Sequence, residues 1–134
     1  MSLRTQEHWI FGLLKDIYSA VGMEARSLAA MGARAIIDHL VTSRAGGAGS
    51  FPKKLGVLQE QGVITKTQVD VIDAAFDAGS AAAHRGYSPT EEDLNILLDI
   101  TESLLLQICV NPVRAARQEA AAKKLRESTP KRDA

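Results

Sequence analysis

Hydrophobic residues recur at three- and four-residue intervals through most of the chain, a spacing that places them on one side of an α-helix. The pattern predicts one helix over residues 6–21 and a second over 23–44, with Leu28 and Ala35 on the apolar side of the second. The glycine-rich segment 45–49 cannot continue a helix and indicates a loop. No segment alternates with the two-residue period of a strand. The pattern therefore favours an all-α fold.

Two helix start signals divide the middle of the chain. Ser50 has the character of an N-cap and predicts a short third helix over residues 51–61. Thr65 and Gln68 form a capping box, in which each side chain binds the free backbone N–H of the other residue. This box predicts a fourth helix that runs as far as His84.

The fifth predicted helix, residues 89–110, is apolar around most of its circumference. Ser88 as the cap, Pro89 in the first turn and Glu91 three residues after the cap mark its beginning. Asn111-Pro112 is expected to break it, because proline cannot continue the backbone hydrogen bonds, and it can start another helix. A helix this apolar either lies at the centre of a fold or is shared with a second subunit. We therefore expect a homodimer through the second or the fifth helix.

The formal net charge is zero, but the charges are unevenly distributed. Residues 1–110 contain nine Lys or Arg and thirteen Asp or Glu, a net charge of −4, whereas residues 111–134 contain seven and three, a net charge of +4. The chain thus divides into an antiparallel helical bundle of about five helices (1–110) and a basic, alanine-rich helix or tail (111–134). An acidic bundle argues against broad binding to a phosphate backbone. The basic extension is either solvated or binds nucleic acid or an acidic partner.

Cysteine and histidine are too few and too scattered for a metal site. Cys109 is the only cysteine, which excludes an internal disulfide and a multi-cysteine zinc site. The three histidines lack the i, i+4 spacing of helical metal ligands, so we expect no metal and no cofactor. The N-terminus has no apolar signal region, and no apolar run approaches the roughly 18 residues of a membrane span. We expect a cytoplasmic protein with no membrane segment.

The most suggestive chemistry lies at the end of the fourth helix. At about 100° per residue, Asp73, Asp77, Ser80 and His84 fall on one line along the edge of the apolar stripe. His84 is either an acid/base group that transfers protons near neutral pH or a helix-ending histidine held by local hydrogen bonds. Asp77, Ser80 and the following Arg85 are the candidate binding residues around it.

The second helix carries two further candidates. Arg34 and Asp38 lie four residues apart, close enough to form an ion pair on the helix surface. Alternatively, Arg34 anchors a partner or the loop around His84. His39 falls on the apolar side of the helix and is interpreted as a core histidine.

Three segments occur in the order and spacing of a known family: LAAMGARAIIDHL (28–40), KLGVLQEQGVI (54–64) and DAGSAAAHRGYSPTEED (77–93). With them the chain resembles the HEPN superfamily of small α-helical bundle proteins, and within it most closely the bacterial domain-of-unknown-function (DUF) family four-one-four-five. The resemblance covers roughly residues 10–110. It implies an antiparallel helical bundle that often pairs as a dimer and is commonly found beside or fused to restriction and defence proteins.

The resemblance also bears on activity. Active members of the wider superfamily cleave RNA without metal, using an arginine followed four to six residues later by a histidine. The histidine would be His84, but Asp77, Ala78 and Gly79 occupy the positions where the arginine is expected. Asp77 also brings a negative charge to the place where phosphate should bind. Arg34 would supply the missing cation only if the second helix packs beside the fourth.

Two main functions follow. The first is a non-catalytic interaction or regulatory domain of a bacterial defence or stress system, with a protein or nucleic-acid partner and with His84 held in local hydrogen bonds. The alternative is a metal-independent endoribonuclease that uses an exposed His84 with Arg34, because Arg85 is expected to point elsewhere. A small-nucleotide binder in the helical groove is a third possibility.

Overall fold

The protein is described by a computed structural model that covers residues 8–47 and 49–132. Every regular element among these residues is helical, which confirms the all-α prediction. The predicted start of the first helix at residue 6 lies outside the described residues. In chain order the elements are α1 (Trp9–Gly22), α2 (Arg26–Ala45), α3 (Phe51–Glu60), α4 (Lys66–His84), α5 (Glu91–Leu105), the π turn η2 (Leu106–Val110) and α6 (Asn111–Ser128).

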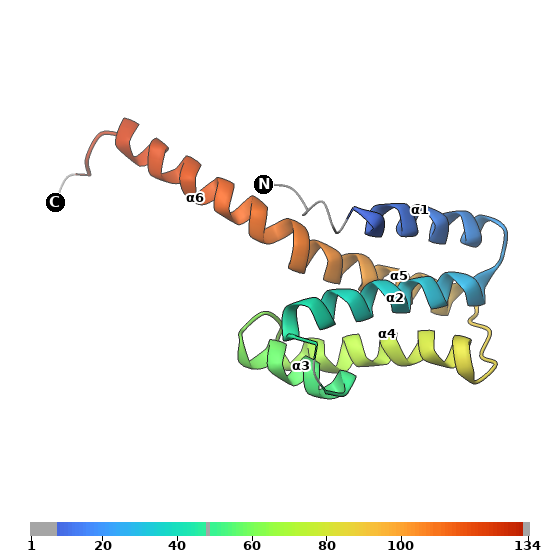
Figure 1. Cartoon of the computed structure of the whole chain (residues 1–134). Helices are drawn as coiled ribbons and strands as arrows, with labels where there is room; N and C mark the ends of the chain where they lie inside the picture. Colours follow the sequence, from blue (N-terminus) through green and yellow to red (C-terminus); the bar gives the residue numbers. More distant parts are fainter. Residues whose placement is uncertain (1–7, 48, 133–134) are drawn as a thin grey trace.

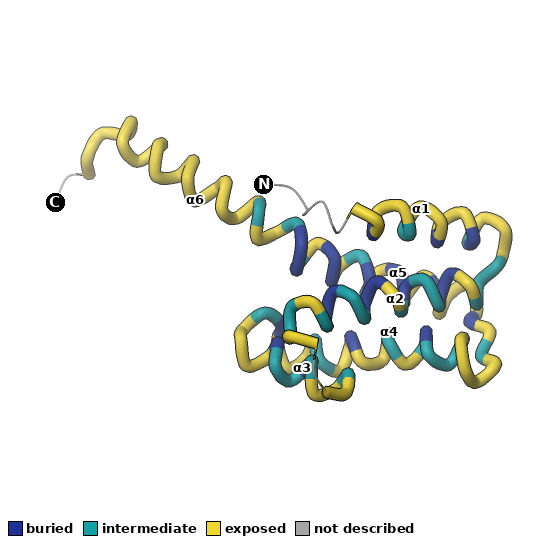
Figure 2. The backbone as a smooth tube through the Cα atoms, viewed as in Figure 1, coloured by how far each residue is buried: buried dark blue, intermediate teal, exposed yellow. Residues whose placement is uncertain are grey.

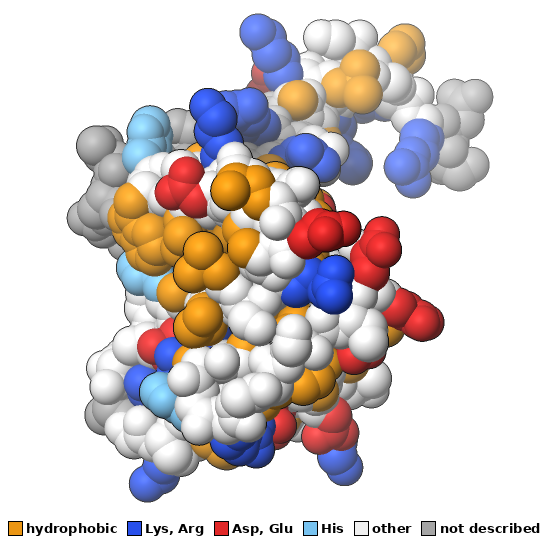
Figure 3. Space-filling model, turned by 90° about the vertical axis from the view of Figure 1, so that its right-hand side faces the viewer, with side chains coloured by type: hydrophobic (Ala, Val, Ile, Leu, Met, Phe, Trp, Pro, Cys, Tyr) orange, Lys and Arg blue, Asp and Glu red, His pale blue; other side chains and the backbone are white. Residues whose placement is uncertain are grey.

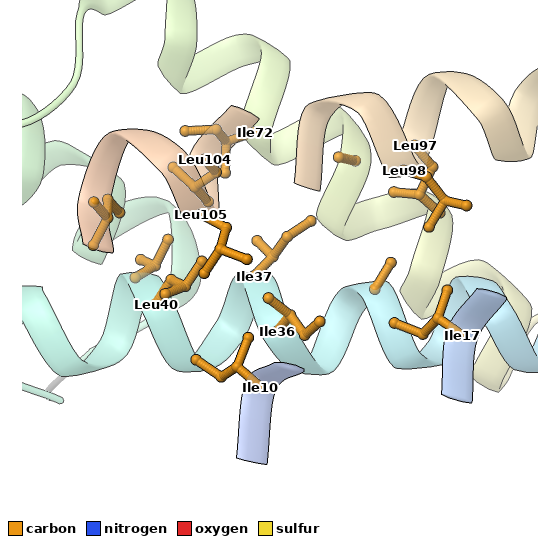
Figure 4. Close-up of a cluster of buried hydrophobic side chains, with 14 of the residues drawn as sticks. Ile10, Ile17, Ile36, Ile37, Leu40, Ile72, Leu97, Leu98, Leu104 and Leu105 are labelled. Atoms are coloured by element: carbon orange, nitrogen blue, oxygen red, sulfur yellow. The ribbon is translucent and has the colours of Figure 1, made fainter. Parts of the chain in front are cut away.

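α2 is the central helix of the bundle, and α1, α3, α4 and α5 all pack against it (Figure 1). Figure 4 shows isoleucine and leucine side chains of α1, α2, α4 and α5 meeting in one apolar core. Burial of each large aliphatic side chain contributes about 1.5–3 kcal/mol. The largest fully buried apolar side chains include Ile10, Ile36, Ile37, Leu40, Leu55, Leu58 and Leu94.

α2 buries small residues together with large ones. Ala29, Ala30 and Ala33 have no exposed surface, so the neighbouring helices approach the α2 backbone closely. The prediction that Leu28 and Ala35 face inward is wrong, because Leu28 is 61% exposed and Ala35 is also exposed. With helices packed on several sides of α2, its buried surface is centred on alanines rather than on Leu28.

The start signals of the third and fourth helices are confirmed. The Ser50 side chain accepts a hydrogen bond from the backbone N–H of Lys53. The capping box at Thr65 and Gln68 has both of its hydrogen bonds. Gly62, just after α3, has a positive φ of 75°, a left-handed conformation that glycine adopts without strain.

The start of α5 differs from the prediction. The N-cap is Thr90, whose side chain accepts from the backbone N–H of Asp93, and Ser88 lies before the helix. Pro89 is buried, and its carbonyl accepts a hydrogen bond of 2.9 Å from Arg26 Nε. The proline is thus held against the first turn of α2, and α5 begins only after it.

The prediction for Asn111-Pro112 is half right: α6 begins at Asn111 with Pro112 in its first turn, but the helix is not broken there. The π turn leads directly into α6, and the backbone N–H of Asn111 donates to the carbonyl of Leu106, five residues back. Proline lacks the N–H of a regular helix, and its ring collides with the carbonyl four residues earlier. The wider π turn immediately before Pro112 accommodates the ring. α5, η2 and α6 therefore form one helix of 38 residues, Glu91–Ser128.

The C-terminal part of this helix leaves the bundle. α6 has no buried residue, and Figure 2 shows it exposed along nearly its whole length while α2 and α5 are buried along one side. The predicted basic extension is thus a solvated helix that projects from the bundle.

By length and composition alone, the helix Glu91–Ser128 is apolar enough over one 18-residue stretch to cross a membrane. This result differs from the expectation that no such run exists. A core helix can meet the same criterion, because burial in protein and burial in lipid select the same side chains. Here the apolar side of α5 packs against α2 and α4.

Candidate functional site

α2 and α4 touch at Gly79. A Cβ atom at this position would lie 2.9 Å from the carbonyl oxygen of Ala30 and would also collide with the side chain of Arg34. The absence of a side chain therefore permits the close approach of the two helices. As a result, Arg34 of α2 lies over the C-terminal half of α4.

Arg34 is held in place by two groups of α4. Its Nε donates a hydrogen bond of 2.8 Å to Ser80 Oγ. Its guanidinium carbon lies 4.7 Å from the centre of the Phe76 ring, a cation–π geometry. The other partner of Phe76 is Phe51 of α3, stacked with the ring centres 3.7 Å apart and the planes 9° from parallel. Three helices thus contribute to the position of one cation.

The expected ion pair between Arg34 and Asp38 is not formed. Arg34 turns toward α4, and Asp38 accepts a hydrogen bond of 3.2 Å from Thr42 Oγ1 on its own helix. A surface ion pair contributes only a few tenths of a kcal/mol, less than the packing that draws Arg34 onto Phe76.

Arg85 folds back along α4, contrary to the expectation that it points elsewhere. The backbone leaves the helical conformation at Arg85, and its Nη2 reaches Asp77 Oδ1 at 2.7 Å and the Asp77 carbonyl at 3.1 Å. Both side chains are more than half exposed, so the pair contributes little to stability. Its effect is electrostatic, because the Asp77 carboxylate offsets the charge of Arg85.

His84 lies in the last turn of α4 and is exposed. It follows Ser80 by one helical turn, so Arg34 lies one turn away along the same line. Within residues 8–47 and 49–132, no hydrogen bond to the His84 side chain is found, which differs from the local hydrogen bonds expected of an interaction domain. The endoribonuclease hypothesis requires α2 to pack beside α4, so that Arg34 can supply the cation. The two helices do pack against each other.

The connection after His84 is fixed by contacts that sequence reasoning missed. Arg26 binds the carbonyl of Pro89, and Ser27 Oγ donates a long hydrogen bond of 3.4 Å to the carbonyl of Tyr87. Both donors belong to the first turn of α2, about 60 residues earlier in the chain. No local spacing in the sequence indicates such a contact.

Tyr87 and Asp93 close the connection onto α5. The Tyr87 hydroxyl donates a hydrogen bond of 2.7 Å to Asp93 Oδ2. This bond raises the pKa of Tyr87, with a smaller contribution from desolvation. It also lowers the pKa of Asp93, to which the Thr90 cap adds. The pair therefore prefers a neutral phenol and an ionised carboxylate.

The cluster combines an exposed histidine with two arginines in different electrostatic states. The charge of Arg85 is offset by the carboxylate of Asp77, whereas the partners of Arg34, Ser80 and Phe76, are uncharged. A phosphate group approaching His84 would meet an attractive charge at Arg34 and a repulsive one at Asp77.

The part of the chain that the structure describes contains no group of three His, Cys, Asp or Glu side chains able to hold a metal ion. His39 is half-buried on α2, and its ring meets that of Trp9 edge-on with the centres 4.8 Å apart. His39 thus lies at the border of the core and not within it, and its expected structural role stays a prediction.

A concave region lies at the base of α6, away from this cluster. It is a cavity of about 300 Å³ between the start of α1 and the η2–α6 junction. Sequence reasoning did not find it, because its two walls are about 100 residues apart in the chain. Its lining consists of His8, Phe11, Cys109, Val110, Val113, Arg114 and Arg117.

Comparison with known proteins identifies a family. Residues 15–128 match the model of a family described as Domain of unknown function (DUF4145). The matched region includes every residue of the His84 cluster, and it continues past residue 110 to the end of α6. No curated protein and no solved structure matches the chain.

Proposed function

The chain belongs to the DUF4145 family, and from this premise we propose that it is a non-catalytic helical interaction domain that binds a protein partner. The resemblance of residues 10–110 to the HEPN superfamily supports a place in a bacterial defence or stress system, which we place in the cytoplasm. It also supports assembly as a homodimer.

The observation that carries the proposal is α6. This helix has 18 residues, none of them buried, and it has no apolar side of its own to pack on the bundle. In proteins most of the stability of a helix comes from packing of one of its sides, and no residue of α6 is buried against the bundle. A helix that projects in this way gains stability when a partner covers it, which is the property expected of a binding element.

The alternative function is a metal-independent endoribonuclease. The position of Arg34 favours it, since a guanidinium with uncharged partners lies one helical turn from an exposed His84. In such a pair the histidine would transfer the proton and the arginine would stabilise the charge of the phosphate. Asp77 counts against it, because its carboxylate lies on the same line of α4 and already binds the second arginine.

RNA cleavage separates the two functions. Purified protein is incubated with structured and single-stranded RNA in the presence of a chelator, beside His84→Ala and Arg34→Ala. The exposed His8→Ala is the matched control for loss of a histidine. We expect no cleavage by any of the four proteins. Cleavage by the wild type and the control that disappears in both site variants would overturn the proposal and establish the endoribonuclease.

Arg34→Ala has a structural effect under either function. Loss of the Ser80 hydrogen bond and of the Phe76 contact should cost about 1–2 kcal/mol. A thermal melt of each variant therefore accompanies the cleavage assay, so that an inactive protein is distinguished from an unfolded one.

A further inference from the structure

The two halves of the long C-terminal helix carry opposite charge. α5 contains five acidic residues and no Lys or Arg, whereas α6 contains five Lys or Arg and two acidic residues. Figure 3 looks at the end of the bundle far from α6: acidic side chains line one edge of the bundle, and basic side chains surround the distant α6. Two such helices placed side by side and antiparallel attract each other along their length.

Three large apolar side chains of this helix are exposed: Ile96 (54%), Leu106 (47%) and Leu125 (67%). Leu125 follows Leu106 by 19 positions, one of which is the residue inserted by the π turn. The remaining 18 positions are five full turns of 3.6 residues, so the two leucines lie on the same side of the helix. A solvated helix gains nothing from such side chains, but a helix–helix contact does.

Charges of both signs flank Leu106 on this side at equal distances. Asp99 precedes Leu106 by seven residues, about two turns. Arg114 follows it by eight, which is also about two turns once the inserted residue is subtracted. Both side chains are exposed, and neither forms an ion pair with another residue among those the structure describes.

We propose that a second copy of this chain packs antiparallel along the α5–α6 helix, with the two-fold axis at Leu106. The two Leu106 side chains meet at the axis, and Asp99 of each copy lies opposite Arg114 of the other. α6 of each protomer then covers the exposed side of α5 in its partner. The inference rests on the proposed function, because it names the partner and the surface of an interaction domain.

The contact is self-complementary, and this property gives a direct test. In Arg114→Glu and in Asp99→Arg, each homodimer places like charges opposite each other at two symmetric positions. We expect each to weaken the dimer about tenfold, because a surface pair changes from attraction to repulsion twice. Mixing the two variants restores both opposite-charge pairs, so the heterodimer should form with wild-type affinity. Sedimentation velocity over a dilution series measures the dimer affinity of the wild type, of each variant and of the mixture of the two variants.

The apolar centre is tested by Leu106→Glu, which should weaken the dimer about 100-fold because it buries two carboxylates at the axis. Val71→Glu is the matched control, since Val71 is 41% exposed on α4, outside the proposed contact. Lys53→Glu on α3 serves the same purpose for the charge reversals. Circular dichroism melts verify that each variant folds.

A monomeric wild type overturns the inference, and so does a dimer that neither charge reversal weakens. Loss of the dimer in Val71→Glu as well as Leu106→Glu would place the contact elsewhere and overturn it also. RNA cleavage that depends on His84 overturns the proposed function whatever the oligomeric state. A monomer that does not cleave RNA overturns the antiparallel contact and the homodimer, but leaves the non-catalytic function in place.

Discussion

α5 and α6 are consecutive parts of one helix, yet different forces hold them. α5 buries six residues against the rest of the bundle, and α6 buries none. α5 is therefore helical because its apolar side is packed, and its intrinsic preference matters little. α6 is rich in alanine, lysine and arginine, which favour helix in solution without any packing. Regular secondary structure alone does not distinguish a core element from a binding element.

Truncating one leucine in α5 and one in α6 should give the largest difference in the free energy of unfolding. Leu98→Ala removes a side chain of α5 that is 5% exposed and should lower the free energy of unfolding by about 3 kcal/mol. Leu125→Ala in α6 should change it by less than about 0.5 kcal/mol. Chemical denaturation at low protein concentration measures both. Equal losses would show that α6 is packed within the monomer.

Two glycines test how closely the bundle helices approach each other. Gly79→Ala should destabilise the protein by about 1–3 kcal/mol, because the added Cβ meets Ala30 and Arg34. Gly56→Ala on α3 should stabilise it by about 0.5–1 kcal/mol, since a Cβ there meets nothing within 4 Å and alanine favours helix. A stabilising Gly79→Ala would contradict the α2–α4 contact.

Glycine substitution tests the intrinsic preference of α6. Ala120→Gly with Ala121→Gly should weaken the local helix by about 1 kcal/mol per residue and reduce the circular dichroism signal at 222 nm. The midpoint of bundle unfolding should not move. Ala33→Gly in buried α2 is the reference, and there the midpoint should fall.

The smallest effect concerns the connection that leads into α5. Tyr87→Phe should lower the melting temperature by about 2 °C or less at pH 7, because the hydroxyl bond to Asp93 is exposed. The lowered pKa of Asp93 means that this stabilisation is present above the ordinary carboxyl pKa and is lost as the pH falls through the folded value. The raised pKa of Tyr87 means that the same stabilisation is also lost in strong alkali, as the pH rises through the pKa of Tyr87 in the folded protein.

Melting curves of wild type and Tyr87→Phe at pH 7 and in acid should therefore converge as the pH falls. A difference that persists when Asp93 is protonated would assign the stabilisation to packing of the Tyr87 ring instead.

Local signals in the sequence predicted the local parts of the structure. Ser50 and the Thr65–Gln68 box cap their helices as expected, because a cap depends on residues within one turn. Ser88 failed as a cap because Arg26 of α2 binds the carbonyl of Pro89 and the helix begins only after it, with Thr90 as the cap. The π turn was not predicted either, since Asn111-Pro112 alone does not show that the preceding turn can widen.

The sequence indicated which residues belong to the candidate site, but it did not indicate which of them contact each other. The line of Asp77, Ser80 and His84 follows from the helical period. Arg34 was a candidate for the same place, but its partners on α4 depend on how α2 packs at Gly79. The return of Arg85 to Asp77 depends on where the helix ends. Tertiary packing decides these contacts, and one-dimensional spacing does not contain it.

The single residue inserted at η2 determines the directions in which the side chains of α6 point around the helix axis. Deletion of one residue from Leu106–Val110 would turn the whole of α6 by about 100° about its own axis. α1 to α5 would keep their packing, whereas the buried Ile108 and Cys109 of η2 would have to repack. α6 would keep all of its side chains but present a different side outward from α5. The binding specificity of such a protein can therefore diverge through a one-codon deletion, with no substitution on the surface that a partner contacts.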